Sequence, residues 1–209
     1  ELLGWAAASA NRYIIEDDYD SEFRLTGKPI PSLQSMDITQ KVIYINTFTK
    51  SLSSTMRISY MVLPPELANR FLEQLSFYSC TVSNFEQYAL MRFINEGYFE
   101  KHINRMRNFY HKQRDILLDA IKRSPLSSHV TIMEEDSGLH FLLKLKMELS
   151  DKEFMQRALQ KGVKLNSLSA YYHDSPDDFA AHTFIINYSY LNTEHLAEAI
   201  NVLYDCIKK

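Results

Sequence analysis

Residues 42–64 read VIYINTFTKSLSSTMRISYMVLP, two apolar runs separated by a loop rich in serine and threonine. The first run, residues 42–48, is β-branched and aromatic, which predicts a buried strand. The second run, residues 57–63, predicts another strand that stops at Pro64, because proline cannot donate to a sheet ladder. Lys50 therefore lies in a loop at the carboxyl end of the first strand.

A shorter apolar run at residues 13–15 predicts an earlier strand, which leads into EDDYDSEFR at residues 16–24. Side chains two apart in an extended segment point the same way, so we expect Asp17 and Tyr19 to face one site. Ligands of α/β proteins bind at the carboxyl ends of sheet strands. The two segments together predict a βαβ-like unit with an acid, a phenol and an amine near one another.

The residue types around Lys50 suit a reactive site. A lysine at this place among small hydroxyl residues can be partly desolvated, and burial or a neighbouring cation lowers an amine's pKa and makes it nucleophilic toward a carbonyl carbon. The planar fork of Arg57 suits a two-point grip on a phosphate, and Thr47 and Thr49 could add hydroxyl donors to the same group. Each feature alone is common on protein surfaces, and only their order and spacing point to a single site.

The remainder of the chain is predicted to be mainly helical and then mixed. Ser83 with Glu86, and Ser150 with Glu153, match the capping box that begins many helices. The expected elements are helices at 67–75, 83–97 and 99–122, strands at 130–133 and 139–145, a helix from 150 to about 162, a strand at 184–188 and a closing helix through 196–203. We place the domain boundary within residues 98–112, which gives domains of 1–97 and 98–209.

The segments EDDYDSEFR and TFTKSLSSTMRISYMVLP resemble the core of the fold-type-I aminotransferases, which use pyridoxal 5′-phosphate (PLP). More narrowly, they resemble the MocR-type members of the GntR transcription regulators, in which an aminotransferase-like effector domain follows a winged-helix domain. Residues 84–115 and 137–145 resemble the same subfamily. The resemblance implies an α/β fold: the C-terminal part of a large domain at 1–97, with a three-stranded remnant, then a linking helix and a small α+β domain at 98–209.

The resemblance also implies roles for single residues. Lys50 matches the catalytic lysine that binds PLP covalently. Asp17 matches the acid that pairs with the pyridine nitrogen and keeps the ring an electron sink. Tyr19 matches the phenol that hydrogen-bonds the ring's 3-oxygen.

The phosphate of the cofactor has its own matching residues. Arg57 corresponds to the phosphate clamp of the family, with Thr47 and Thr49 as helpers. The sequence predicts no metal ligands, because Cys80 and Cys206 are too few and too far apart for a metal site or a disulfide framework. We expect both to be free thiols in a reducing cytoplasm.

Two departures from the family pattern bear on activity. The family binds the substrate carboxylate with an arginine near the last strand, where this chain reads HTFIINYSY at 182–190, with Ile185 at about that place. No arginine follows Arg157, so either the effector is not a simple amino acid or Lys164 or His173 replaces the arginine. The family's large domain also has a half that would precede Glu1, so we expect weak or no PLP binding by this chain alone.

Composition narrows the remaining possibilities. The net charge is −3 and the pI is about 6.2, which does not favour a nucleic-acid surface on this chain. DNA contact is therefore expected only through a winged-helix domain outside the chain. No apolar run approaches the roughly 20 residues of a membrane span, and residues 1–12 do not read as a secretion signal.

Three functions remain open. The first is an effector-sensing domain that binds PLP with a small amine or amino acid and signals to a DNA-binding module. The second is a PLP-dependent aminotransferase that moves an amino group between an amino acid and a 2-oxo acid, with Lys50 as nucleophile and then general base. The third is a non-catalytic dimerisation scaffold. The resemblance implies a homodimer in each case.

Overall fold

The computed structural model describes residues 1–25, 27, 30–134, 136, 138–173 and 178–208. Its contacts divide the chain into two compact units. The first contains Glu1–Glu22 with Gly27–Arg105, and the second contains Phe23–Thr26 with Met106–Lys209. Within the described ranges, no helix is both long and apolar enough to cross a bilayer.

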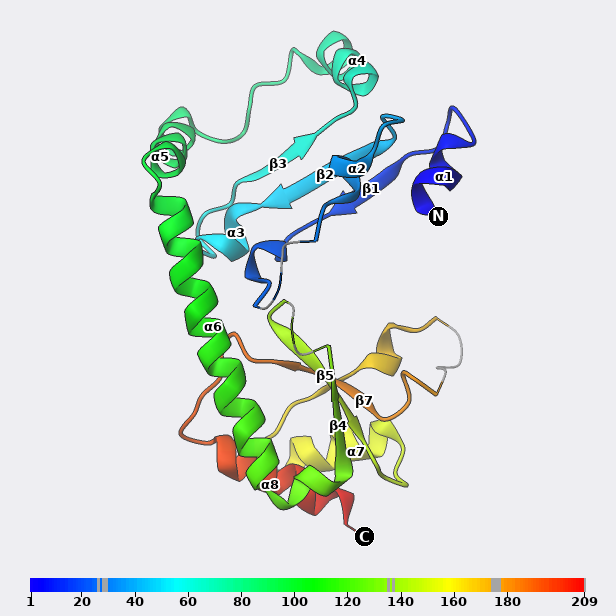
Figure 1. Cartoon of the computed structure of the whole chain (residues 1–209), viewed down its shortest axis with the longest axis vertical. Coiled ribbons are helices and arrows are strands. Elements are labelled where there is room, and N and C mark those ends of the chain that lie inside the picture. Colours follow the sequence, from blue (N-terminus) through cyan, green and yellow to red (C-terminus); the bar gives the residue numbers. More distant parts are fainter. Residues whose placement is uncertain (26, 28–29, 135, 137, 174–177, 209) are drawn as a thin grey trace. The chain divides into compact units, whose positions relative to one another are not determined.

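A three-stranded sheet in the order β1-β2-β3 forms the centre of the first unit (Figure 1). The strands are β1 (Ile14–Asp17), β2 (Val42–Thr47) and β3 (Ser59–Val62). β1 and β2 are parallel and β3 is antiparallel to β2. The parallel pair confirms the predicted βαβ-like start, because its crossover carries a short helix, α2 (Leu33–Met36).

Helices supply the rest of the first unit. They are α1 (Leu2–Ala7), α3 (Phe48–Ser51), α4 (Pro65–Leu75), α5 (Asn84–Asn95) and the start of α6 (Tyr98–Arg123), with a 3-10 turn, η1 (Ser21–Phe23), that continues into the second unit. The prediction of a loop around Lys50 is wrong, because residues Phe48–Ser51 form the short helix α3. Sequence periodicity could not reveal so short a helix.

The predicted ends of α5 are confirmed. Ser83 accepts a hydrogen bond from the Glu86 N–H at 3.2 Å, which satisfies a backbone donor at the helix start. Gly97 follows the other end with φ +75°, the left-handed conformation that favours glycine after a helix.

The second unit is built on an antiparallel sheet in the order β4-β5-β7-β6. Its strands are β4 (Val130–Met133), β5 (His140–Leu145), β6 (Asn166–Ser167) and β7 (Thr183–Asn187), and its other elements are η2 (Pro125–His129), α7 (Asp151–Gln160), η3 (Leu168–Tyr171) and α8 (Leu196–Ile207). Fully buried aromatic residues form its core, with the Phe154 and Phe184 rings 5.2 Å apart. The capping box of Ser150 and Glu153 is confirmed at the start of α7.

Residues 23–25 come from the first half of the sequence but belong to the second unit. Phe23 is 0% exposed, and its ring lies edge-on to Tyr110 of α6 at 5.1 Å. The Leu25 N–H donates to the Asp136 carbonyl at 3.3 Å. The two units thus divide between residues 105 and 106, and the second unit also includes this early segment. The domain boundary predicted from the sequence, at residue 97, stays a prediction.

Candidate functional site

One edge of the three-stranded sheet gathers the ends of three chain segments (Figure 1). β1 and β2 run parallel, with Asp17 opposite Ile45, so both strands end at this edge. β3 begins there, because its first residue pairs with the last residue of β2. Lys50 follows β2 within α3, and Arg57 lies just before β3. The backbone therefore brings Asp17, Lys50 and Arg57 to one edge of the sheet.

The acidic residues at the end of β1 differ in their contacts: within the described ranges, two carboxylates bind groups of the protein and one does not. Glu16 accepts the N–H groups of the first two residues of α2, at 2.7 and 2.9 Å, and so holds that helix. Asp18 accepts the Tyr44 hydroxyl at 2.8 Å. Asp17 points to the other face, because side chains alternate along a strand. It is exposed and has no hydrogen bond or ion pair among the described residues, which leaves its carboxylate available to a ligand.

Tyr19 lies in a bend beyond β1, with 44% of its surface exposed. The alternation that predicted a shared direction with Asp17 applies within a strand, and β1 ends at Asp17. Tyr19 lies beyond the strand, so its shared direction with Asp17 stays a prediction. Its role toward a ligand stays a prediction.

Thr47 and Thr49 hold the loop that carries Arg57. Thr49 Oγ1 donates to the Met56 carbonyl at 3.0 Å, and Thr47 Oγ1 lies 3.2 Å from the Ile58 carbonyl. Thr47 Oγ1 also accepts the Thr49 N–H at 3.2 Å, which caps α3. A hydroxyl has one proton to donate, so both are engaged within this network. A direct bond to a phosphate, as predicted, would require them to exchange partners.

Lys50 and Arg57 are both exposed side chains. Neither has an ion pair or hydrogen bond in the part of the chain that the structure describes. Because Lys50 is exposed, the expectation that it is partly desolvated is wrong for this chain, and Ser51 is the buried residue of α3. Among the described residues, this edge thus presents two cations and the Asp17 carboxylate without protein partners, a set suited to a ligand that carries both an anionic group and a basic nitrogen.

A polar network behind the strand ends was not foreseen. Asn46 is only 3% exposed and donates to the Tyr44 hydroxyl at 3.0 Å and to the Glu22 carboxyl at 3.3 Å. Burial raises the pKa of the Glu22 carboxyl, the nearby Asp18 carboxylate acts in the same direction, and the bond from Asn46 opposes both. The available signal was a pair of polar residues, Tyr44 and Asn46, two apart among the apolar residues of β2.

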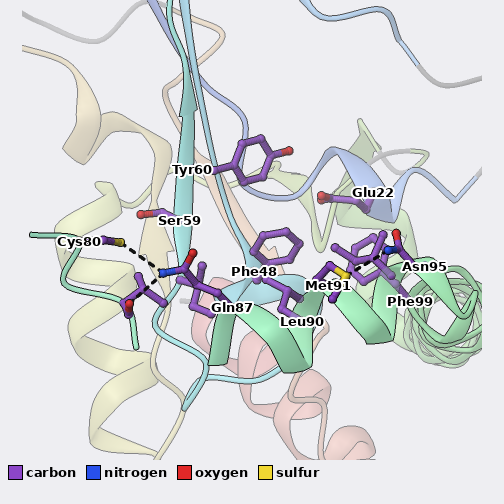
Figure 2. A pocket seen from close by; sticks show the side chains of 13 residues that line it. Glu22, Phe48, Ser59, Tyr60, Cys80, Gln87, Leu90, Met91, Asn95 and Phe99 are labelled. Atoms are coloured by element: carbon purple, nitrogen blue, oxygen red, sulfur yellow. Dashed lines mark hydrogen bonds between the residues drawn. The ribbon is translucent and has the colours of Figure 1, made fainter. Parts of the chain in front are cut away.

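Glu22 also borders a cavity of about 690 Å³ in the first unit (Figure 2). Most of the lining is apolar. Figure 2 shows Phe48 at its centre, where the ring lies 5.6 Å from the Tyr60 ring and 5.9 Å from the Phe99 ring. Because Phe48 begins α3, this apolar packing supports the helix that carries Lys50.

The place expected for a carboxylate-binding arginine lies in β7. Ile185 pairs with Leu142 on one side and with Asn166 on the other, in the middle of the sheet of the second unit. Of the two suggested replacements, Lys164 is exposed just before β6, and His173 follows η3. The proposal that either replaces the arginine stays a prediction.

Sequence comparison links the chain to regulators. It is 47% identical over 176 residues to the uncharacterized HTH-type transcriptional regulator YdeL of Bacillus subtilis, which covers 84% of this chain and 38% of YdeL. It is 36% identical over 191 residues to the probable rhizopine catabolism regulatory protein MocR of Rhizobium meliloti, covering 91% of this chain and 38% of MocR. The chain thus spans less than half the length of these relatives. No model of a known protein family matches it.

Structural comparison links it to enzymes. The kynurenine aminotransferase of Pyrococcus horikoshii, solved with PMP and substrates, is similar with a TM-score of 0.80 and 29% identity, over 99% of this chain and 50% of that chain. The predicted fold, part of a fold-type-I aminotransferase, is thereby confirmed.

Proposed function

This chain belongs to the fold-type-I aminotransferase-like domains related to MocR-type HTH regulators, and from that premise we propose that it is an effector-sensing domain that binds PLP. The observation that carries the proposal is the shared sheet edge, where Asp17, Lys50 and Arg57 have no partners among the described residues. The effector would be a small amine or amino acid. The signal would pass to a winged-helix DNA-binding domain elsewhere in the polypeptide, in a homodimer.

The side chains at the edge match the groups of the proposed cofactor. Arg57 would hold the phosphate, because a guanidinium offers two parallel donors to two oxygens. Asp17 would accept the proton of the pyridine nitrogen, and Lys50 would supply the amine for covalent attachment. When bound, PLP offers a carbon that reacts with amines and a ring that withdraws electrons.

The network behind the edge would keep these groups in place. Thr47 and Thr49 fix the loop before β3, Glu16 holds the start of α2, and Asp18 accepts the Tyr44 hydroxyl of β2. Binding residues whose backbone is already fixed by such hydrogen bonds lose less conformational freedom when a ligand binds, which raises the affinity.

Covalent capture of PLP tests the proposal. The full-length protein is incubated with PLP, reduced with borohydride and digested, and the labelled peptide is identified by mass spectrometry. We expect the label on Lys50, its loss in Lys50→Ala and its retention in Lys122→Ala, an exposed lysine far along α6. Labelling that is unchanged in Lys50→Ala would refute the proposed attachment.

The alternative is a PLP-dependent aminotransferase, favoured by the likeness to the kynurenine enzyme. Ile185 at the expected arginine position weighs against it, because an alkyl side chain cannot pair with a carboxylate. Reading the residues upstream of Glu1 separates the two: a basic winged-helix segment supports the regulator. Formation of a 2-oxo acid from an amino acid by the PLP-loaded protein would support the enzyme.

A further inference from the structure

A second cavity in the first unit, of about 320 Å³, is lined by two aromatic rings and three basic side chains. Phe93 comes from α5, and Tyr98, Lys101, His102 and Arg105 come from the first turns of α6. It is separate from the residues proposed to bind PLP, none of which lines it. We propose that this cavity is a binding site for a small aromatic phosphate.

Helix geometry concentrates the positive charge on one side. Tyr98, Lys101, His102 and Arg105 are spaced by three and four residues, so they project from the same side of α6. Glu100, between them in sequence, projects elsewhere. Like charges four apart on a helix repel, so an anion bound between Lys101 and Arg105 would relieve an unfavourable pairing.

No carboxylate neutralises these cations within the described ranges of the chain. Glu96, at the end of α5, is engaged by Arg92 at 2.6 Å. Among the described residues, the one hydrogen bond of the Arg105 guanidinium is to the His102 ring, with Nη2 3.3 Å from Nδ1. The guanidinium therefore keeps donors free, and its planar fork suits the oxygens of a phosphate.

The aromatic part of the cavity indicates what the phosphate is attached to. The Phe93 and Tyr98 rings are stacked with centroids 6.0 Å apart, and the His102 ring lies edge-on to Phe93 at 6.5 Å. Such rings favour another flat ring beside them. The volume is at the lower end of the roughly 300–1,000 Å³ of ligand pockets, which limits the ligand to about one ring and its anionic group.

Calorimetric titration with four probes tests the site: phenyl phosphate, inorganic phosphate, phenol and benzoate, at low ionic strength with the intact chain. Phenyl phosphate is expected to bind about ten-fold more tightly than any other probe, because it alone engages both the rings and the cations with a dianion. Equal affinity for phenyl phosphate and inorganic phosphate, or for phenyl phosphate and benzoate, would overturn the assignment.

Variants then locate the binding. Lys101→Gln and Arg105→Gln should each weaken phenyl phosphate about ten-fold, since each removes a charge-assisted hydrogen bond. Lys112→Gln, an exposed lysine further along α6, is the matched control and should change affinity less than about two-fold. If Lys112→Gln weakens binding as much, only diffuse charge attraction is present and the inference fails.

A last variant separates this site from the proposed cofactor site. Arg57→Gln should leave phenyl phosphate affinity unchanged while it weakens PLP. If Arg57→Gln abolishes phenyl phosphate binding, the probe occupies the sheet edge, and the second site is refuted without harm to the proposed function.

Discussion

Thr49 links α3 to the loop that precedes β3. Its hydroxyl donates to the Met56 carbonyl, next to Arg57. Thr49→Val keeps the shape but removes this bond, which should lower the free energy of unfolding by about 0.5–1.5 kcal/mol. Because Arg57 loses its support, PLP affinity should fall as well.

Denaturant unfolding and PLP titration of the full-length protein check this prediction. Thr131→Val, on the exposed side of β4, is the matched control. Identical behaviour of the two variants in both measurements would show that the Thr49 hydroxyl does not position Arg57.

Glu22 should make stability fall as pH rises through the mildly acidic range. Burial raises its pKa in the folded chain above the unfolded value, so the folded state binds the proton more tightly. The contribution of protonated Glu22 to the free energy of unfolding is fully present below the unfolded pKa, and it is lost as pH rises through the folded pKa. Glu22→Gln should therefore gain melting temperature relative to the unmodified chain at pH 7, and gain less at pH 4.

Thermal unfolding at both pH values measures the difference between the two chains. Glu73→Gln, an exposed acid in α4, is the control and should show no such dependence. A gain for Glu22→Gln that is the same at pH 4 and pH 7 would mean that the carboxyl is not desolvated in solution.

At the scale of elements, helix starts depend on single side chains. Ser150 accepts the Glu153 N–H at 3.3 Å, and the Glu153 carboxylate reaches back to the Ser150 N–H and hydroxyl. Ser150→Ala should lower the free energy of unfolding by about 1 kcal/mol. Ser127→Ala, an exposed serine in η2, should change it little.

The pH dependence of this variant provides a second check. The side-chain hydrogen bond from Ser150 lowers the pKa of Glu153, so its contribution is present above the unfolded pKa and is lost as pH falls through the folded pKa. The difference between Ser150→Ala and the unmodified chain, measured by urea unfolding, should shrink in acid. A difference that grows in acid would contradict the capping box.

At the scale of the whole molecule, an early segment completes the second unit. Phe23 is fully buried against Tyr110, which is itself 8% exposed. Phe23→Ala should lower the free energy of unfolding by about 3–5 kcal/mol, because it leaves a cavity in that unit. Phe77→Ala, at a position where the ring is 73% exposed, is the control.

Calorimetric unfolding of the full chain gives the readout for Phe23. We expect the loss to appear in the transition of the second unit, although the substitution lies near residue 20 of the sequence. If Phe23→Ala melts like Phe77→Ala, the segment at residues 23–25 does not belong to that unit in solution.

The sequence alone determined the main strands and long helices, because apolar periodicity, capping residues and glycine stops are local properties. It also singled out Asp17, Lys50 and Arg57 as candidates. The three-dimensional fold was needed to show that Asp17 has no partner among the described residues, that α3 forms around Lys50, and that Thr47 and Thr49 hold the Arg57 loop. Those outcomes depend on hydrogen bonds and burial between segments that are distant in sequence. The residues adjacent in sequence do not determine which distant groups a side chain contacts.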